Sequence, residues 1–180
     1  MAIIDKEILA QFRDKRTQQD AFKVLVRQYS SKIYWHARRM LRNHEDANDV
    51  TQEVLVKIWS NLLNFKEESA LSTWIFRITT NETISFIRKA GRHLTVAETE
   101  IPDTSSNSSE SFPFNEGDTL KKLNRAIESL PVKQRQVFIL RYYDEMKYEE
   151  MSEVLSTSVG ALKASYHHAV KKIEQSVLND

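Results

Sequence analysis

The feature that most constrains the fold is a pair of short apolar stripes in residues 148–173. In the first half, apolar side chains recur at helical spacing, at Tyr148, Met151, Val154 and Leu155. Three hydroxyl residues, 156–158, then interrupt the stripe, and the Ser158 hydroxyl is suited to cap a new helix. The second helix has a stripe of its own, at Val159, Leu162, Tyr166, Ala169, Ile173 and Val177. The pattern predicts two helices joined by a tight turn.

The opposite side of this second helix is polar. It carries cations, hydrogen-bond donors and small residues, at Lys163, Ala164, His167, His168 and Lys171. Such side chains could lie in a DNA major groove, which would make the pair a helix-turn-helix motif. The same pattern also fits a hairpin of a helical bundle with a solvated polar face. This stretch alone favours neither interpretation.

Composition predicts an all-α fold. The chain has three Gly and three Pro among 180 residues, and its hydrophobic content of 41% can form one good core or two small ones. The absence of Cys excludes disulfides, thiolate catalysis and nearly every zinc-finger pattern. There is no apolar run long enough to span a membrane, and the first residues do not resemble a signal peptide. We therefore expect a soluble, cytoplasmic protein.

Charge divides the chain into three parts. The formal net charge is +1, but residues 1–92 carry +5, residues 93–119 carry −6 with no Lys or Arg, and residues 120–180 carry +2. The middle part is also rich in Ser and holds two of the three Pro. We predict two small, mildly basic helical domains joined by a flexible acidic linker. The predicted bounds are 1–92 for the first domain, 93–118 for the linker and 119–180 for the second domain.

The first domain is expected to contain four helices. They are predicted at residues 6–13 with Asp5 as the cap, 20–42, 46–62 and 71–90 with Gly91 as the end. The helix over 46–62 carries three carboxylates, at Asp46, Asp49 and Glu53. A metal site there is disfavoured because all three lie on one helix without an obvious partner, so a protein-docking face is the better interpretation.

The helix over 71–90 has a second polar flank. Trp74, Arg77, Asn81 and Arg88 lie partly off its apolar stripe. An aromatic ring, an amide and arginines on one flank can stack on bases and pair with base edges and phosphates. Alternatively, Trp74 is a core tryptophan, which is the commoner outcome for this residue type.

Three separated motifs together resemble one family. The family is that of the extracytoplasmic-function (ECF) sigma factors, in the sigma-70 family. Its core-binding helix resembles DANDVTQEVLVKIW, and its −10-element helix resembles LSTWIFRITTNETISFIRK. Its −35-binding domain resembles the stretch from SLPVKQRQVFIL to the final helix. The resemblance covers about residues 20–173 and leaves the linker unconstrained. It implies a dissociable subunit that binds core RNA polymerase, recognises two promoter elements and helps to melt the DNA.

The resemblance also implies roles for individual residues. Residues that match polymerase-docking positions are Asp49, Gln52 and Glu53. Residues that match the −10 helix, or the loop that receives a flipped base, are Phe65, Lys66, Ser69, Trp74, Arg77, Asn81 and Arg88. Lys163, His167 and His168 match major-groove positions, with Ala164 and Lys171 on the same face and Ser158 and Val159 near the DNA backbone. Ala164 stands where relatives often have a hydroxyl, so the −35 sequence is not predicted.

The expected partners are core RNA polymerase, promoter DNA and an anti-sigma factor, which in this family is often membrane-bound. No cofactor, metal, catalytic residue or small-molecule substrate is expected, and the free chain is expected to be monomeric. One alternative is a conventional transcription regulator that uses the same helix-turn-helix without polymerase. A metal-dependent hydrolase is a further alternative, but the five His are dispersed and there is no Gly-rich phosphate loop.

Overall fold

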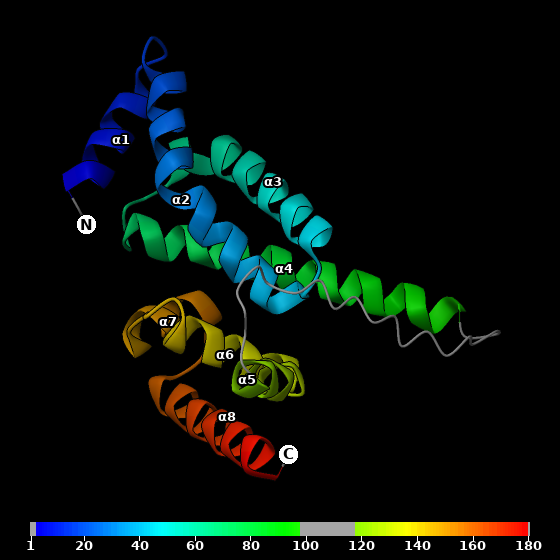
Figure 1. The fold of residues 1–180 in the computed structure, drawn as a ribbon. Coiled ribbons are helices and arrows are strands. Elements are labelled where there is room, and N and C mark those ends of the chain that lie inside the picture. Colours follow the sequence, from blue (N-terminus) through cyan, green and yellow to red (C-terminus); the bar gives the residue numbers. More distant parts are fainter. Residues whose placement is uncertain (1–2, 98–117, 180) are drawn as a thin grey trace. The chain divides into compact units, whose positions relative to one another are not determined.

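The computed structural model describes residues 3–97 and 118–179, and every regular element in these two ranges is helical. The chain divides into two compact units, Met1–Val96 and Ala97–Asp180 (Figure 1). The predicted all-α, two-domain class is therefore confirmed. The bounds of the predicted linker stay a prediction, because residues 98–117 lie outside the described residues.

The first unit contains four α-helices and a short 3-10 helix in its described part. They are α1 (Ile3–Arg13), α2 (Gln18–Leu41), α3 (His44–Asn61), η1 (Leu62–Asn64) and α4 (Leu71–Ala97). Helices α2 and α3 pack on each other, and α1 packs on α2 and η1. Their predicted stripes form one core, with the buried side chains Leu25, Ile33, Val50, Val54, Ile58, Leu71 and Ile75. A buried hydrogen bond of 3.3 Å between His36 and Thr80 joins α2 to α4.

A tight turn connects α2 to α3. Arg42 ends α2 in the left-handed region, with φ of 67°. The Asn43 side chain then accepts hydrogen bonds from the backbone N–H groups of Glu45 at 2.7 Å and Asp46 at 3.2 Å. Because Asn43 caps the helix, α3 begins at His44, two residues before the predicted start.

The prediction that Asp5 caps α1 was wrong. Asp5 lies inside α1, and its side chain is buried. The Tyr29 hydroxyl donates to the Asp5 carboxylate at 2.8 Å, and the Gln28 amide donates at 3.3 Å. The carboxylate therefore joins α1 to α2 instead of satisfying a helix terminus.

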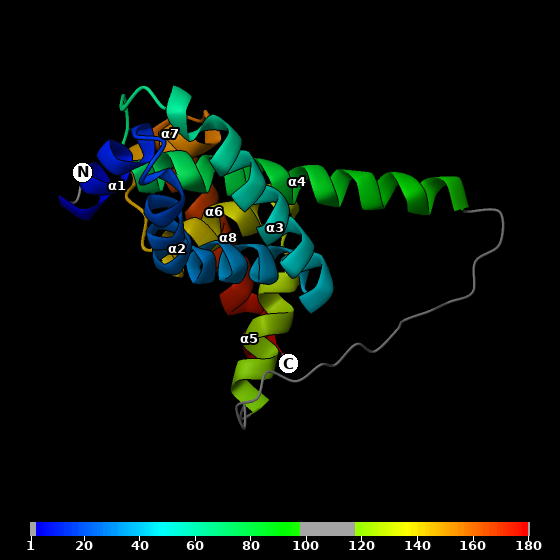
Figure 2. The ribbon, with the colours of Figure 1, turned by 90° about the horizontal axis from the view of Figure 1, so that it is seen from above.

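The predicted end of α4 at Gly91 was also wrong. Helix α4 continues to Ala97, and Figure 2 shows its carboxyl-terminal part extending beyond α2 and α3. Glycine costs only about 1 kcal/mol in a helix interior, and no proline follows before Ala97 to stop the helix. The first five residues of the predicted linker, 93–97, are consequently helical.

The second unit consists of four helices in its described part. They are α5 (Asp118–Glu128), α6 (Val132–Tyr142), α7 (Tyr148–Leu155) and α8 (Val159–Asn179), and α8 packs on the other three. The core side chains include Ala126, Ile127, Leu130, Phe138, Ala169 and Ile173. Between α7 and α8, Ser156 adopts a left-handed φ of 49°, and the Ser158 hydroxyl accepts from the Ala161 N–H at 3.3 Å. The predicted cap at Ser158 is confirmed.

The bond between Tyr29 and Asp5 predicts an alkaline transition of the first unit. Burial raises the pKa of Tyr29 above its ordinary value of 10.0, and the hydrogen bond to Asp5 raises it further. Neutral Tyr29 thus stabilises the fold at pH below 10, and this contribution is lost as pH rises above 10. Tyr29→Phe should lower the free energy of unfolding at pH 7 by about 1–3 kcal/mol. As pH rises above 10, the free energy of unfolding should then fall less for Tyr29→Phe than for the wild-type protein.

Urea unfolding at pH 7 and at pH 9–11.5, followed by tryptophan fluorescence, measures this effect. All three Trp lie in the first unit, so the signal reports that unit alone. Tyr142→Phe, in the second unit, is the control and should leave the transition unchanged. An identical pH profile for Tyr29→Phe and the wild-type protein would contradict the prediction.

Candidate functional site

The polar face predicted for the last helix is a single exposed face of α8. Leu162, Ala169 and Ile173 are buried on one side of the helix. The residues on the other side are all exposed: Lys163, Ala164, His167, His168 and Lys171. Exposed Ser158 and half-buried Val159 lie at the helix start, so the structure brings the seven predicted −35 residues to one surface of the helix-turn-helix.

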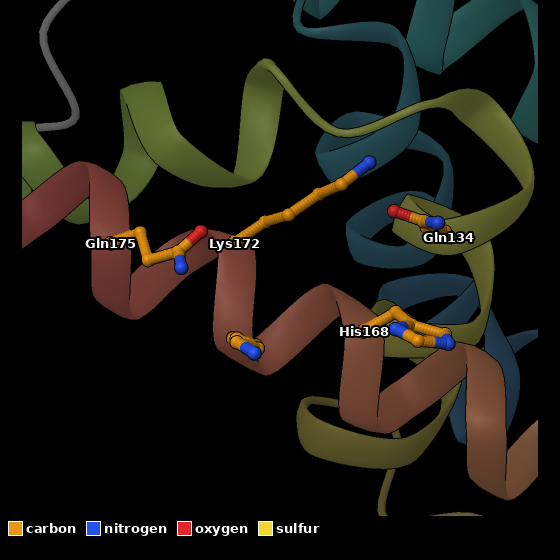
Figure 3. A pocket seen from close by; sticks show the side chains of 5 residues that line it. Gln134, His168, Lys172 and Gln175 are labelled. Atoms are coloured by element: carbon orange, nitrogen blue, oxygen red, sulfur yellow. The ribbon is translucent and has the colours of Figure 1, made fainter.

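A shallow pocket continues this face toward α6. It has a volume of about 480 Å³ and is lined by Gln134, His168, Lys171, Lys172 and Gln175. Figure 3 shows Gln134 on α6 facing the side chains of His168 and Lys172 on α8. Amides, ammonium groups and an imidazole can all donate hydrogen bonds to phosphate oxygens. Gln134 did not emerge from the sequence, because only the packing of α6 on α8 brings it to this face. Lys172, which lies on α8 itself, was also not among the predicted residues.

The carboxylate-bearing helix α3 presents a second face. Asp49, Gln52 and Glu53 are exposed on it, as the docking interpretation requires. The same face continues toward the end of the helix with Val56 and, in η1, Leu63, whose exposed fractions are 65% and 55%. A polar patch with an apolar extension is typical of protein interfaces, and the apolar part was missed because it follows the charged residues rather than the buried stripe.

The carboxylates of α3 differ in burial and in electrostatic environment. Burial raises the pKa of the Asp46 carboxyl, and the neighbouring Asp49 and Glu45 carboxylates raise it further. Asp46 is half-buried, whereas Asp49 and Glu53 are exposed. The described residues contain no group of three His, Asp or Glu side chains that could hold a metal ion.

The residues predicted to contact the −10 element divide into two groups. Phe65 and Trp74 are buried in the core of the first unit, with their ring centroids 5.2 Å apart. Lys66, Arg77, Asn81 and Arg88 are exposed, and Ser69 is half-buried. The structure thus brings Trp74 into the core, which was the alternative interpretation, and leaves polar side chains at the surface of α4 and of the loop before it.

Contacts on two sides hold the loop between η1 and α4. Phe65 anchors the loop to the core through Trp74. Glu67, with a left-handed φ of 59°, forms a salt bridge of 2.7 Å with Arg13 at the end of α1. Because both charged groups are partly exposed, the ion pair contributes less than about 1 kcal/mol. The buried aromatic pair is therefore the stronger anchor of the loop.

The chain is similar to proteins of a known family. The family model of sigma-70 region 2 matches residues 25–93, and that of sigma-70 region 4 matches residues 120–173. The ECF RNA polymerase sigma factor SigW of Bacillus subtilis is 31% identical, over 91% of this chain and 92% of the relative. This chain belongs to the ECF sigma factors. The ECF sigma-E factor of Escherichia coli K12 is 28% identical, over 92% of this chain and 91% of the relative.

Solved structures agree with the fold of this sigma factor. The sigma factor RpoE of Bartonella quintana, solved in complex with the anti-sigma factor NepR, superposes with a TM-score of 0.74 at 24% identity, over 88% of this chain and 98% of that one. CnrH, solved with the cytosolic domain of CnrY, gives a TM-score of 0.73 at 23% identity, over 98% of this chain and 99% of that one. At these identities the likeness concerns the fold.

The family also fixes the identity of the two units. The region 2 match lies in α2 to α4, which include the exposed faces of α3 and α4. The region 4 match lies in α5 to α8, which include the helix-turn-helix. The ECF sigma factor predicted from three motifs is confirmed. The protein is thus a promoter-specificity factor for transcription initiation, and the bundle hairpin alternative is no longer needed.

The two groups of −10 residues should differ in what their loss does. Trp74→Ala removes a buried ring and should lower the free energy of unfolding of the first unit by about 3–5 kcal/mol. Arg77→Ala changes an exposed side chain and should alter it by less than about 0.5 kcal/mol. Urea unfolding followed by circular dichroism compares them. A Trp74→Ala variant as stable as the wild-type protein but unable to open a promoter would restore the base-stacking interpretation.

Proposed function

We propose that the exposed faces of α3, α4 and α8 divide the work of this sigma factor. The face of α3 binds core polymerase, the face of α4 and the preceding loop read the −10 element, and the face of α8 reads the −35 element. The observation that supports this most directly is that each of the three helices buries one stripe in its own unit and exposes a polar face of suitable chemistry.

For polymerase binding, the proposed surface combines charge with apolar contact. Asp49 and Glu53 can pair with arginines, and Gln52 adds hydrogen bonds. The resemblance to the family points to the clamp helices of the largest polymerase subunit as the partner. Val56 and Leu63 extend this surface, and their exposed area would supply the desolvated centre that charges alone lack. We therefore add these two residues to the proposed docking face.

For the −10 element, the proposed contacts come from the exposed set. Lys66, Arg77, Asn81 and Arg88 can pair with phosphates and base edges of opened DNA. A base that leaves the stack loses a few kcal/mol of stacking, so a shaped pocket that receives it both drives opening and reads sequence. Phe65 and Trp74 support that pocket from the core, and Ser69 lies at its half-buried edge.

For the −35 element, α8 is proposed to enter the major groove. Lys163, His167 and His168 would face base edges, with small Ala164 between them allowing close approach. Lys171 and the neighbouring Lys172 would contact phosphates. Ser158 and Val159 would lie against the backbone at the helix start.

The proposed partners follow from the same surfaces. RpoE and CnrH were solved bound to NepR and to CnrY. An anti-sigma factor that covers the promoter or polymerase faces of this chain would hold it inactive.

Among the described residues, no helix combines the length and the hydropathy that a membrane span requires. The proposed place of action of the sigma factor is the cytoplasm, where core polymerase and promoter DNA meet. We assign no covalent step to the residues of the chain.

Run-off transcription with core polymerase on the upstream region of its own gene tests the function. Glu53→Lys and Val56→Glu should each weaken binding to core polymerase at least about tenfold. Glu53→Lys reverses a charge in the interface, and Val56→Glu buries a new charge there. Transcription should recover as the concentration of core polymerase rises, since both DNA-binding faces are intact. Glu7→Lys, an exposed carboxylate on α1 outside this face, is the matched control. Unchanged polymerase affinity in both α3 variants would refute the docking face.

A further inference from the structure

Tyr148, the first residue of α7, contacts cations from two other helices. The Nζ atom of Lys163 on α8 lies 5.6 Å from the centroid of the Tyr148 ring. The Cζ atom of Arg141 on α6 lies 5.2 Å from the same centroid. Both distances are within the range of about 6 Å over which an aromatic ring attracts a cation. One ring therefore links α6, α7 and α8 in the helix-turn-helix unit.

The ring has a fixed place in the unit. Arg141 is half-buried, and its Nη1 donates to the carbonyl oxygen of Met146 at 3.0 Å, in the turn before α7. The Tyr148 ring also packs edge to face on the Tyr166 ring, with 6.4 Å between the centroids. Tyr166 in turn stacks on buried Phe138, with 5.9 Å between the ring centroids. A chain of contacts thus runs from the turn and the core to the ring, and from the ring to Lys163.

Neither of the two cations, Arg141 and Lys163, has a carboxylate partner among the described residues. Two positive charges beside one ring favour the approach of a negatively charged ligand. Lys163 is exposed on the same face of α8 that is proposed to meet DNA.

A lysine that binds a DNA phosphate or base loses conformational entropy. Its long side chain has many rotamers, and part of this freedom is lost when the ammonium group binds. A ring that already restricts the side chain reduces that loss on binding. Lys171, on the same face, has no such ring contact among the described residues.

We propose that Tyr148 is a positioning residue for promoter recognition, because its ring holds the Lys163 ammonium group at the DNA-facing side of α8. The inference rests on the proposed −35 role of α8. It adds a residue outside that face, whose side chain acts through Lys163 and not by touching DNA.

Equilibrium binding to promoter DNA tests the proposal. The full chain is assembled with core polymerase into the holoenzyme. The promoter is a genomic fragment selected by the wild-type holoenzyme, and the control DNA is the same fragment with its −35 region scrambled. Fluorescence anisotropy measures the affinity of the holoenzyme for each DNA. Tyr148→Phe retains the ring and should bind the promoter within about twofold of the wild-type protein. Tyr148→Leu removes the ring and should bind it about three- to fivefold more weakly.

A double-mutant cycle separates positioning from a general structural role. On a Lys163→Ala background, Tyr148→Leu should cause no further loss, since the side chain that the ring positions is gone. On a Lys171→Ala background, which is the matched control, Tyr148→Leu should retain its full effect. Equal losses on both backgrounds, or wild-type affinity of Tyr148→Leu, would overturn the proposal.

Proton NMR of the free wild-type chain provides a readout that does not depend on a variant folding. The ε-methylene protons of Lys163, assigned with Lys163→Arg, should be shifted upfield by the Tyr148 ring current, and a random-coil position would overturn the proposal. If the wild-type holoenzyme binds the intact and scrambled promoters equally, the proposed −35 function fails and the inference with it. If it discriminates but Tyr148→Leu discriminates equally well, only the Tyr148 inference fails.

Discussion

Burial of one stripe on each helix is the constraint on which the surfaces of this sigma factor depend. Leu162, Ala169 and Ile173 fix the rotation of α8, and Val50, Val54 and Ile58 fix that of α3. Each fully buried aliphatic side chain contributes about 1.5–3 kcal/mol, whereas an exposed ion pair contributes about 1 kcal/mol or less. Three buried side chains per helix therefore outweigh any preference of the polar residues for a particular direction. The proposed binding faces are exposed because burial of the apolar side chains turns the opposite side of each helix outward.

Helical periodicity sufficed to predict the elements, but not all of their ends. The cap at Ser158 was predictable because it depends on backbone groups within one turn. The role of Asp5 was not, since its partner Tyr29 lies on another helix and nothing local distinguishes a buried carboxylate from a cap. Gly91 was predicted to end α4, but glycine only weakens a helix, and no proline follows before Ala97.

The candidate site was predicted as faces, and the errors within it have a common cause. A single helix shows which residues share a side, but not which of them a neighbouring loop covers. Trp74 lies on the polar flank of α4, yet Phe65 packs on it and both are buried. Gln134 joins the surface of α8 through the packing of α6, and Val56 belongs to the α3 face because its side chain is exposed among the described residues. The family resemblance supplied roles, while packing decided which side chains can reach a partner.

Each unit presents only a few cations on its proposed DNA-binding face, so each alone gains little affinity for DNA from counterion release. We expect polymerase to hold the two units at a set distance, so that the second contact with DNA forms at high effective concentration. The most direct measurement compares the free chain, core polymerase and the assembled holoenzyme for binding to one promoter and to a version scrambled in both elements. The account predicts that only the holoenzyme discriminates between the two DNAs. Equal discrimination by the free chain would contradict it and would indicate a regulator that recognises DNA without polymerase.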